Sequence, residues 1–492
     1  MSPTASVYAG FGPGPTEVFL VRALVVGGGG REHAIALELH RAEAEVVAAT
    51  PNANPGIERL SMATLRTDLL DTSPIVEFAL QQRVQLAVIG PEAPLANGLA
   101  DALRAADIPV VGPDRAAARI EWSKRFCREL LAKQGVPGNP KFQSVTNLSE
   151  LKSAVANFTG PFVVKPSGLT AGKGVWVQGS DFQTAVEGEA YAERLLASPS
   201  GRDGLLIEEK LEGEEFSQMA FVTDSGIYPM PAVQDYKRAL EGNQGGNTGG
   251  MGSYSQRDHM LPFLSADQRD RALDILRQSV AALRAEGLAY RGILYGGFML
   301  TTEGPKLLEF NARFGDPEAL NVLSLYEPGD FAELMLGVAT GRVDPDYVRF
   351  RLRATVAKYV VPVGYGSQPQ AGALIELDEP SIEDMGVRLC FGSVEAAGAG
   401  RVKLTSSRGV ALVGEASAIY EAHRRVESAL AFVKGSYYVR HDLGSKADVA
   451  TKVDHMRKLF SPNAKPSPLP LSVAAPDAAP ESHGTATQIL TE

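Results

Sequence analysis

Short apolar runs alternate with helical segments at the beginning of the chain. Residues 21–30 read VRALVVGGGG, and the helix-forming segment REHAIALELHRA follows at once. Two further buried-type runs, at 86–89 and 109–111, each lead into Gly-Pro. Strands separated by helices predict a parallel sheet, and therefore an α/β domain, over this part of the chain.

The pattern changes to a hairpin at residues 161–178. Two apolar runs, PFVVK and VWVQ, flank the sequence PSGLTAGKG, and they predict two strands joined by a glycine-rich loop that can close over phosphates. An amphipathic segment after Ser180 and a strand at Leu205–Glu209 follow. In the stretch EGNQGGNTGGMG, at 241–252, six of twelve residues are glycine, so this polar segment cannot pack a core.

A helix is predicted to begin at Ser265, which opens a Ser-x-x-Gln capping pattern. Apolar residues then recur at spacings of three and four until Gly287 ends the helix. These residues are Leu273, Leu276, Val280 and Leu283. Two strands, Ile293–Leu300 and Lys306–Asn311, are predicted around the turn at 302–305.

Length and composition indicate a globular protein of about three domains, at roughly 100–200 residues each. The net charge is −10 over 492 residues, whereas a general nucleic-acid binder would be basic. A local basic pocket for a phosphorylated small molecule is compatible with that total. The two cysteines, Cys127 and Cys390, form neither a disulfide framework nor paired metal ligands.

The chain has no apolar run of about 18–20 residues and no basic, apolar leader at its start. We therefore expect a cytoplasmic protein with no membrane or nucleic-acid partner. Residues 1–21 are expected to be loose. After Phe460, six of twenty residues are proline, which predicts a disordered tail at 461–492 that activity does not need.

The first glycine loop does not fit the dinucleotide fingerprint G-x-G-x-x-G. Starting at Gly27 the last position is Glu32, and starting at Gly28 it is His33. What remains is a helix N-terminus preceded by exposed amides, which favours an anion such as a phosphate ester. A plain strand-to-helix turn is the alternative.

The second glycine loop is not a Walker A loop. Only three residues separate Gly168 from Gly172, and Gly174 occupies the position that must supply a hydroxyl to magnesium. The pattern instead predicts a flexible hairpin cover, with Lys165 at the end of its first strand. A solvated edge residue is the alternative for a lone lysine on a strand.

Glu309 and Asn311 stand two apart in LLEFNARFGDPE, so their side chains share one face of the predicted strand. A carboxylate and an amide oxygen are hard ligands, suited to magnesium bound together with nucleotide phosphates. A polar, solvent-facing strand is the alternative, but the neighbours Leu307, Leu308 and Phe310 mark a buried strand, where a carboxylate needs a partner. No histidine pair has metal-ligand spacing and no G-x-S-x-G is present, so zinc and serine hydrolases lose support.

Seven segments along the chain resemble, in sequence order, those of the phosphoribosylamine-glycine ligases (glycinamide ribonucleotide synthetases). These are ATP-grasp enzymes of purine biosynthesis. The QDYKRALEGNQGGNTGGMGSYS block is the most specific, because other ATP-grasp ligases share the nucleotide segments but not this one. The resemblance covers about residues 22–443. The matches are GGGGREHAIA at 27–36, GPEAPL at 90–95, EWSKRF at 121–126, KPSGLTAGKGV at 165–175, IEEKLEGEEFS at 207–217, the block at 234–255 and EFNARFGDPE at 309–318.

The resemblance implies an α/β ATP-grasp fold. It divides the chain into an N-terminal α/β domain at 22–121 and an ATP-grasp domain at 122–330, whose glycine-rich lid covers about 122–205 and whose central part covers about 206–330. A smaller C-terminal α+β domain at 331–445 follows, and a linker and disordered tail occupy 446–492.

The resemblance also implies the reaction: ATP-dependent ligation of 5-phosphoribosylamine and glycine, through a glycyl phosphate, by a monomer that uses Mg²⁺ or Mn²⁺. Another ATP-grasp ligase, acting on a different phosphoribosyl or small carboxylate substrate, is the alternative. A binding-only protein is disfavoured, because it has no need of metal ligands and cations aimed at the γ-phosphate.

The residue roles follow from the same resemblance. Lys165, Arg313 and Asp316 would act in catalysis, and Glu309 and Asn311 would hold the metal. ATP would be held by Lys124, Lys165, Gly172, Lys173, Gly174, Glu208, Glu209, Leu211 and Glu215. The other substrates would contact Gly28, Gly29, Gly30, Arg31, Glu92, Asp235, Lys237, Arg238, Asn247, Thr248, Gly249 and Gly250. Gly297 departs from the wider ATP-grasp pattern, in which a carboxylate or amide at this position helps to bind a second metal.

Overall fold

The computed structural model describes residues 20–169 and 174–461. Its first unit is a five-stranded sheet in the order β3-β2-β1-β4-β5, parallel throughout, so the predicted parallel α/β domain is confirmed. The strands are β1 Arg22–Val26, β2 Glu45–Thr50, β3 Ser61–Arg66, β4 Leu86–Ile89 and β5 Val110–Val111. The helices are α1 Gly30–Arg41, α2 Pro55–Leu60, α3 Thr72–Gln81, α4 Glu92–Ala96 and α5 Leu99–Ala105.

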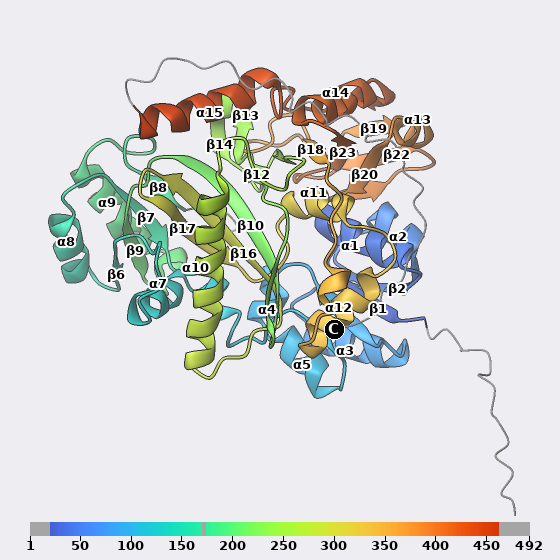
Figure 1. Ribbon diagram of the computed structural model, residues 1–492, viewed down its shortest axis with the longest axis horizontal. Coiled ribbons are helices and arrows are strands. Elements are labelled where there is room, and N and C mark those ends of the chain that lie inside the picture. Colours follow the sequence, from blue (N-terminus) through green and yellow to red (C-terminus); the bar gives the residue numbers. More distant parts are fainter. Residues whose placement is uncertain (1–19, 170–173, 462–492) are drawn as a thin grey trace, which may run out of the picture.

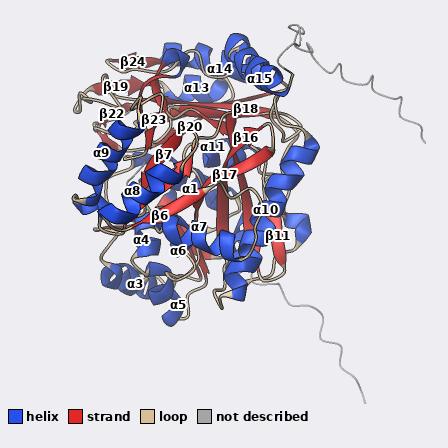
Figure 2. Cartoon of the chain, turned by 90° about the vertical axis from the view of Figure 1, so that its left-hand side faces the viewer, coloured by secondary structure: helices blue, strands red, loops and turns tan. Residues whose placement is uncertain are grey.

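The lid is a four-stranded antiparallel sheet in the order β6-β9-β7-β8. Two short helices, α6 Arg119–Trp122 and α7 Lys124–Lys133, lead into it. The predicted hairpin is confirmed, since Val163 pairs with Val177 across the glycine-rich loop. Helices α8 and α9 cover the sheet (Figure 2), and the lid has a core of its own. The elements are β6 Phe142–Val145, α8 Leu148–Asn157, β7 Phe162–Pro166, β8 Trp176–Val177, α9 Ala185–Leu196, η1 Pro199–Gly201 and β9 Leu205–Glu209.

The central part is built on a second antiparallel sheet, in the order β11-β10-β16-β17, against which α10 packs. Helix α10, Ala266–Ala285, begins as predicted: Ser265 and Gln268 form the reciprocal capping box. The two predicted strands at the metal-ligand pair are confirmed as β16 and β17, which bring Gly297 opposite Glu309. The strands are β10 Glu214–Thr223, β11 Gly226–Pro229, β16 Gly292–Thr301 and β17 Gly304–Asn311.

The C-terminal region shares a sheet with the central part, because the strand order β12-β15-β18-β23-β20 joins strands from both. The main apolar core is accordingly continuous from β1 to α15, while a smaller core lies within the C-terminal region. The sheet consists of β12 Gln234–Asp235, β15 Gly252–Ser255, β18 Ala354–Val360, β20 Val387–Phe391 and β23 Val410–Ala416. Smaller strands are β13 Arg238–Leu240, β14 Gln244–Asn247, β19 Leu374–Leu377, β21 Val394–Ala396, β22 Arg401–Leu404 and β24 Val433–Gly435. The remaining helices are α11 Glu318–Leu325, α12 Phe331–Thr340, α13 Glu379–Asp384 and α14 Ile419–Ala429, with single turns at η2 Glu241–Asn243, η3 Pro345–Tyr347 and η4 Leu430–Phe432.

Residues 446–460 are not a linker, and this corrects the sequence-based expectation. They form helix α15, Lys446–Phe460, which contacts β10 and lies at the top of Figure 1. Asp448 accepts a hydrogen bond from the Tyr236 hydroxyl. Lys452 Nζ and His455 Nδ1 lie 3.2 and 2.6 Å from the carboxylate of Glu214. A polar helix was missed because its partners are more than 200 residues away in sequence. The predicted tail at 461–492 lies outside the described residues apart from Ser461, as does the loose start at 1–19.

In the part of the chain that the structure describes, no helix combines the length and apolar character that a membrane span requires.

We expect truncation at two places to have different effects. A chain that ends at Ser461 should melt at the temperature of the full chain. A chain that ends at Ser445 should lose about 3 kcal/mol of unfolding free energy, because Glu214 and Tyr236 lose charged hydrogen-bond partners in buried surroundings. Thermal unfolding followed by circular dichroism measures both. Equal melting temperatures for the two truncated chains would contradict a stabilising role of α15.

Candidate functional site

A buried carboxylate fixes the catalytic lysine predicted on the lid. Strand β7 carries Lys165 and the adjacent strand β9 carries Glu208, and Lys165 Nζ lies 2.7 Å from Glu208 Oε2. Arg128, from α7, donates from Nε to Glu208 Oε1 at 2.8 Å. Burial alone would raise the pKa of Glu208, but Arg128 and Lys165 lower it to about 2. Glu208 is therefore ionised and holds Lys165 in place.

The same cluster reaches the central sheet. Arg128 Nη2 donates to the carbonyls of Leu307 and Leu308 on β17, at 3.0 and 2.8 Å, and Lys165 Nζ donates to that of Leu308 at 3.4 Å. The lid strand and the strand that carries Glu309 are thus joined through one ion cluster. Arg128 was not among the sequence-predicted residues, although it lies just beyond the EWSKRF segment.

Glu309 lies among positively charged side chains on β17, two residues before Asn311. Neither side chain has a hydrogen-bond partner among residues 20–169 and 174–461. Burial alone would raise the pKa of Glu309, but Lys237, Lys124, Lys165 and Arg313 lower it overall. An ionised carboxylate beside a free amide oxygen is a suitable pair of magnesium ligands.

The protein offers no fuller ligand set. No group of three or more His, Cys, Asp or Glu side chains in the described part of the chain could hold a metal. Magnesium commonly takes one or two carboxylates and completes its shell with phosphates and water, so the Glu309 and Asn311 pair fits a metal shared with a nucleotide. A Cβ on Gly297 would lie 3.6 Å from Glu309 Cγ, an ordinary contact, so the glycine is not required there by the space around a Cβ.

Lys124 opens α7 beside the start of the glycine-rich loop. Its backbone N–H donates to the Ser167 carbonyl at 2.9 Å, and its Nζ donates to the Gly168 carbonyl at 3.2 Å. Burial lowers its pKa, while Glu309 opposes that shift. Of the predicted loop residues, Gly172 and Lys173 lie outside the described residues, and the Gly174 carbonyl accepts from the Tyr191 hydroxyl at 3.2 Å.

Arg313 is held between two carboxylates. Its Nη2 lies 3.3 Å from Glu121 Oε1 and its Nε lies 3.4 Å from Glu92 Oε2. Glu121 Oε2 also accepts from the Ala312 backbone N–H at 2.8 Å. Burial raises the pKa of Glu121 to about 7, whereas Arg313 lowers that of Glu92. Glu121 therefore orders the segment directly after Asn311, and it is a residue that the sequence analysis quoted, in EWSKRF, but gave no role.

The first glycine loop lies next to this cluster, with its amides partly used. Gly29 N–H donates to Glu32 Oε2 at 2.7 Å, and Arg31 donates to Glu32 Oε1 and to the Phe314 carbonyl at 2.6 and 3.1 Å. A Cβ on Gly30 would lie 2.2 Å from the Tyr359 hydroxyl, so only glycine allows this close approach. An anion at Gly28–Arg31 remains a prediction, and it would compete with Glu32 for the Gly29 amide.

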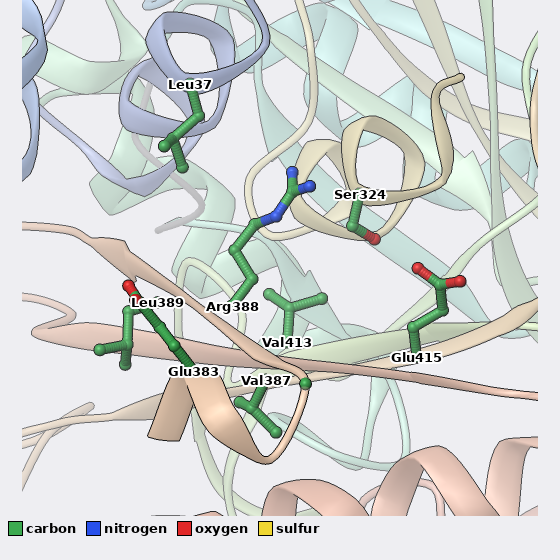
Figure 3. A pocket seen from close by; sticks show the side chains of 9 residues that line it. Leu37, Ser324, Glu383, Val387, Arg388, Leu389, Val413 and Glu415 are labelled. Carbon is green, nitrogen blue, oxygen red and sulfur yellow. The ribbon is translucent and has the colours of Figure 1, made fainter. Parts of the chain in front are cut away.

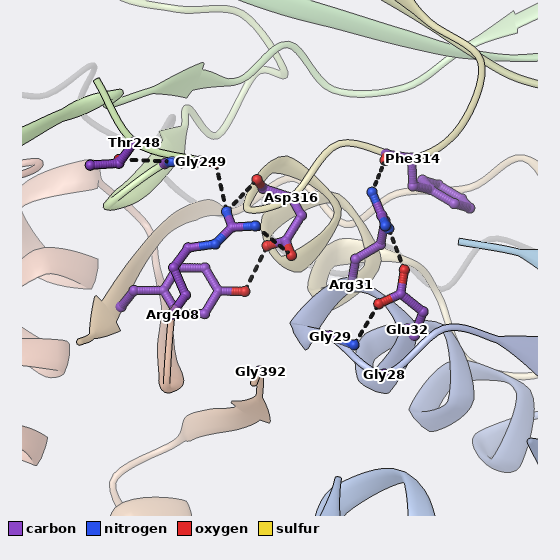
Figure 4. A network of polar contacts seen from close by, with 12 residues as sticks. Gly28, Gly29, Arg31, Glu32, Thr248, Gly249, Phe314, Asp316, Gly392 and Arg408 are labelled. Carbon is purple, nitrogen blue, oxygen red and sulfur yellow. Dashed lines mark hydrogen bonds and ion pairs between the residues drawn. The ribbon is translucent and has the colours of Figure 1, made fainter. Parts of the chain in front are cut away.

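Figure 4 shows how the C-terminal region reaches the site through Arg408. Arg408 Nη1 donates to the carbonyls of Gly249 and Asp316, each at 2.6 Å, and Nη2 donates to Asp316 Oδ2 at 3.0 Å. The Tyr359 hydroxyl donates to Asp316 Oδ1 at 2.6 Å. Arg408 therefore joins the predicted residues Gly249 and Asp316, and Tyr359 binds Asp316. The sequence did not predict a role for Arg408 or Tyr359, because the C-terminal region agrees only weakly with the family pattern, at YVVPVGYG.

Asp235, Lys237 and Glu215 form a second charged group that faces the site. Lys237 Nζ lies 3.4 Å from Glu215 Oε2 and 3.9 Å from Asp235 Oδ2. Burial raises the pKa of Asp235 to about 7, although Lys237 opposes this. The Thr248 hydroxyl donates to the Lys237 carbonyl at 2.9 Å and accepts from Gly250 N–H at 3.1 Å, so the glycine-rich segment is attached to Lys237.

Other predicted residues lie at the margin. Arg238 and Asn247 pair across the β13–β14 hairpin, where Asn247 is exposed. Glu209 accepts from the Lys141 N–H at 2.9 Å at the end of β9, and Leu211 follows it in the chain. Their contacts with ligands remain predictions.

A hollow of about 320 Å³ between α1, α11 and the C-terminal region contains none of the predicted site residues (Figure 3). Two of its charged residues pair with neighbours outside the lining: Arg388 with Glu38 at 2.5 Å, and Glu415 with Arg351 at 2.7 Å. It does not belong to the candidate site.

A lid and a central antiparallel sheet that together surround a Lys, Glu and Asn cluster define an ATP-grasp protein. The sequence matches the family "Phosphoribosylglycinamide synthetase, N domain" over residues 21–121 and "Phosphoribosylglycinamide synthetase, ATP-grasp (A) domain" over residues 122–319. The chain belongs to the phosphoribosylglycinamide synthetase family. The resemblance inferred from its motifs is confirmed.

Relatives and solved structures agree with this family. The phosphoribosylamine–glycine ligase of Thermococcus gammatolerans is 42% identical over 90% of this chain and 100% of its own length. That of Methanothermobacter thermautotrophicus is 45% identical over 90% of this chain and 100% of its own. The crystal structure of the Thermotoga maritima phosphoribosylamine–glycine ligase matches with a TM-score of 0.72 and 27% identity, over 86% of this chain and 100% of that one. A biotin carboxylase domain from Hydrogenobacter thermophilus, 16% identical with a TM-score of 0.65 over 89% of this chain and 93% of its own, shares the fold.

We expect Glu121→Gln to lower kcat/KM about tenfold above about pH 8, where the wild-type carboxylate is ionised and holds Arg313. Below about pH 6 the wild-type carboxyl is protonated and resembles glutamine, so the ratio of the two proteins should approach one. Steady-state pH profiles measure this ratio. Glu129→Gln, at an exposed position of α7, is the control. A ratio that does not change with pH would contradict the role of the Glu121 charge.

Proposed function

We propose that this ATP-dependent ligase joins 5-phosphoribosylamine and glycine, and forms glycinamide ribonucleotide, ADP and phosphate. The observation that carries the proposal is the ring of cations around Glu309, in a chain of the phosphoribosylglycinamide synthetase family. Two like charges about 4 Å apart repel by roughly 4 kcal/mol at an effective dielectric near 20. A carboxylate can therefore approach a triphosphate only where cations are already in place.

The reaction proceeds in two balanced steps in this proposal. A glycine carboxylate oxygen attacks the γ-phosphorus and the bond to ADP breaks, which gives glycyl phosphate. The amine nitrogen of phosphoribosylamine then attacks the acyl carbon, phosphate leaves, and the nitrogen loses a proton.

In this proposal, the positively charged side chains would bind the phosphates, and the carboxylate and amide would bind the metal. Lys124, beside Gly168, and Lys165, held by Glu208, would bind the phosphates. Glu309 and Asn311 would hold Mg²⁺ or Mn²⁺, which neutralises developing charge on the phosphoryl oxygens. Arg313 would orient the acyl phosphate, because its two carboxylate partners fix the direction of the guanidinium.

Glycine and phosphoribosylamine would bind to a second set of residues near Glu309. Asp235, Lys237 and the attached segment Thr248–Gly250 would contact glycine and the amine. The segment Gly28–Arg31 and Glu92 would contact the phosphoribosyl group. Asp316 would orient these groups, since Arg408 and Tyr359 fix its carboxylate.

The test is ADP formation by the purified protein with ATP, Mg²⁺, glycine and freshly generated phosphoribosylamine, with each component omitted in turn. We expect ADP release to require both glycine and phosphoribosylamine. A panel of other amines and small carboxylates separates this ligase from one with a different substrate. Turnover with another acceptor, but not with phosphoribosylamine, would overturn the proposal.

Glu309→Gln is expected to lower kcat at least about 10²-fold, because it removes the negative charge that would hold the metal. Glu303→Gln is the matched control, since Glu303 precedes the same strand but its side chain is 75% exposed and pairs with Lys306. Near-normal turnover of Glu309→Gln would remove this residue from the metal site. A dependence of kcat on Mg²⁺ concentration, measured for both variants, separates weak metal binding from lost chemistry.

A further inference from the structure

A second hollow, of about 660 Å³, lies outside the candidate site, where α5, α6 and the start of α7 face the turn before β9. Its wall carries four arginines against two aspartates, although the net charge of the chain is −10. The half-buried indole of Trp122 lines it as well. A positive hollow with an aromatic wall in an acidic protein suggests a ligand that is both anionic and aromatic.

Two of the arginines have no carboxylate partner in the described part of the chain, and a third has one only at 4.0 Å. Within residues 20–169 and 174–461, Arg119 and Arg202 form no ion pair, and the nearest carboxylate to Arg125 is that of Glu129 at 4.0 Å. The guanidinium of Arg119 lies 4.0 Å from the centre of the Phe126 ring. Stacking holds the plane of a guanidinium and leaves the N–H groups at its edge free for an anion.

The backbone near the hollow contributes little to anion binding. The first amides of α7 are already occupied: those of Lys124 and Arg125 donate to Ser167, and that of Phe126 donates to the Ser123 hydroxyl. The affinity of the hollow for an anion therefore depends on the guanidinium groups, which bind phosphate oxygens in pairs.

We propose that this hollow is a second nucleotide site, distinct from the ATP site, for a nucleoside phosphate. The phosphate would lie on Arg119, Arg125 and Arg202. The base would stack on Trp122, whose ring is fixed by a 3.3 Å hydrogen bond from its indole N–H to the Arg115 carbonyl. Asp203 would accept the ribose hydroxyls. The volume lies within the range of roughly 300–1,000 Å³ that is typical of small-molecule sites.

A ligand there would act on the phosphate-binding loop. The Ser167 N–H donates to the Gly204 carbonyl at 2.9 Å, and Gly204 lines the hollow. Asp203 Oδ2 lies 3.1 Å from the position of a Cβ on Gly168. A nucleotide that binds Asp203 and moves Gly204 would therefore shift Ser167 and Gly168, which are hydrogen-bonded to Lys124. This shift would change the KM for ATP.

The test uses Trp122 as its own reporter. The chain has two tryptophans, so Trp176→Phe leaves Trp122 alone. This protein is titrated with guanosine 5′-monophosphate while a non-hydrolysable ATP analogue and Mg²⁺ saturate the ATP site. We expect a saturable change in fluorescence, and Arg119→Ala with Arg202→Ala should weaken binding at least about tenfold.

Arg257→Ala with Arg277→Ala is the matched control, because it removes the same charge from exposed positions outside the hollow. ADP formation by all these proteins at saturating substrate verifies that they are folded, and it tests the ligase proposal separately. The absence of a saturable signal, or equal weakening in the control, would overturn the second site. Inorganic phosphate binding as tightly as the nucleotide would overturn its assignment to a nucleoside phosphate.

Discussion

The buried carboxylate of Glu208 is the interaction on which the geometry of the site depends. It joins Arg128 of α7 to Lys165 of the lid, and Arg128 in turn binds the carbonyls of Leu307 and Leu308. Burying an ion pair is expensive, and removing one member would leave an uncompensated charge at a cost of about 3–5 kcal/mol. The cluster therefore fixes three elements at once, and it sets the distance between the lid lysine and the strand that carries Glu309.

The segment that follows Glu309 receives contacts from α6, the N-terminal domain, the central sheet and the C-terminal region. Glu121, on the linking helix α6, binds the Ala312 amide, and Arg31 of the N-terminal domain binds the Phe314 carbonyl. From the C-terminal region, Arg408 binds Asp316. The Tyr295 hydroxyl of the central sheet donates to Glu318 at 2.8 Å. Residues 312–318 are thus positioned by contacts from several parts of the fold, which explains how a polar segment can be ordered where those parts meet.

Local patterns were sufficient to predict much of this arrangement. The β-branched runs identified the parallel sheet, and the capping box at Ser265 with the apolar spacing identified α10, because these signals depend only on neighbours in sequence. Glu309 and Asn311 could be paired for the same reason. Arg408 and Tyr359 could not be predicted as site residues, because they contact Asp316, which lies 92 and 43 residues away in sequence. Helix α15 was missed for the same physical reason, since its polar residues find partners only after the chain has folded.

The electrostatics of the site show why these distant contacts matter. Lys124, Lys165, Lys237 and Arg313 all lower the pKa of Glu309, and such a set of cations would repel itself without carboxylates placed among it. Each of three of these cations forms ion pairs with carboxylates: Lys165 with Glu208, Arg313 with Glu121 and Glu92, and Lys237 with Asp235 and Glu215. Apart from Asp235, which lies two residues before Lys237, each of these acids comes from a different stretch of the chain from the cation that it pairs with. The lowered pKa of Glu309 is therefore a property of the assembled fold, whereas the local motif supplies only Glu309 and Asn311 themselves.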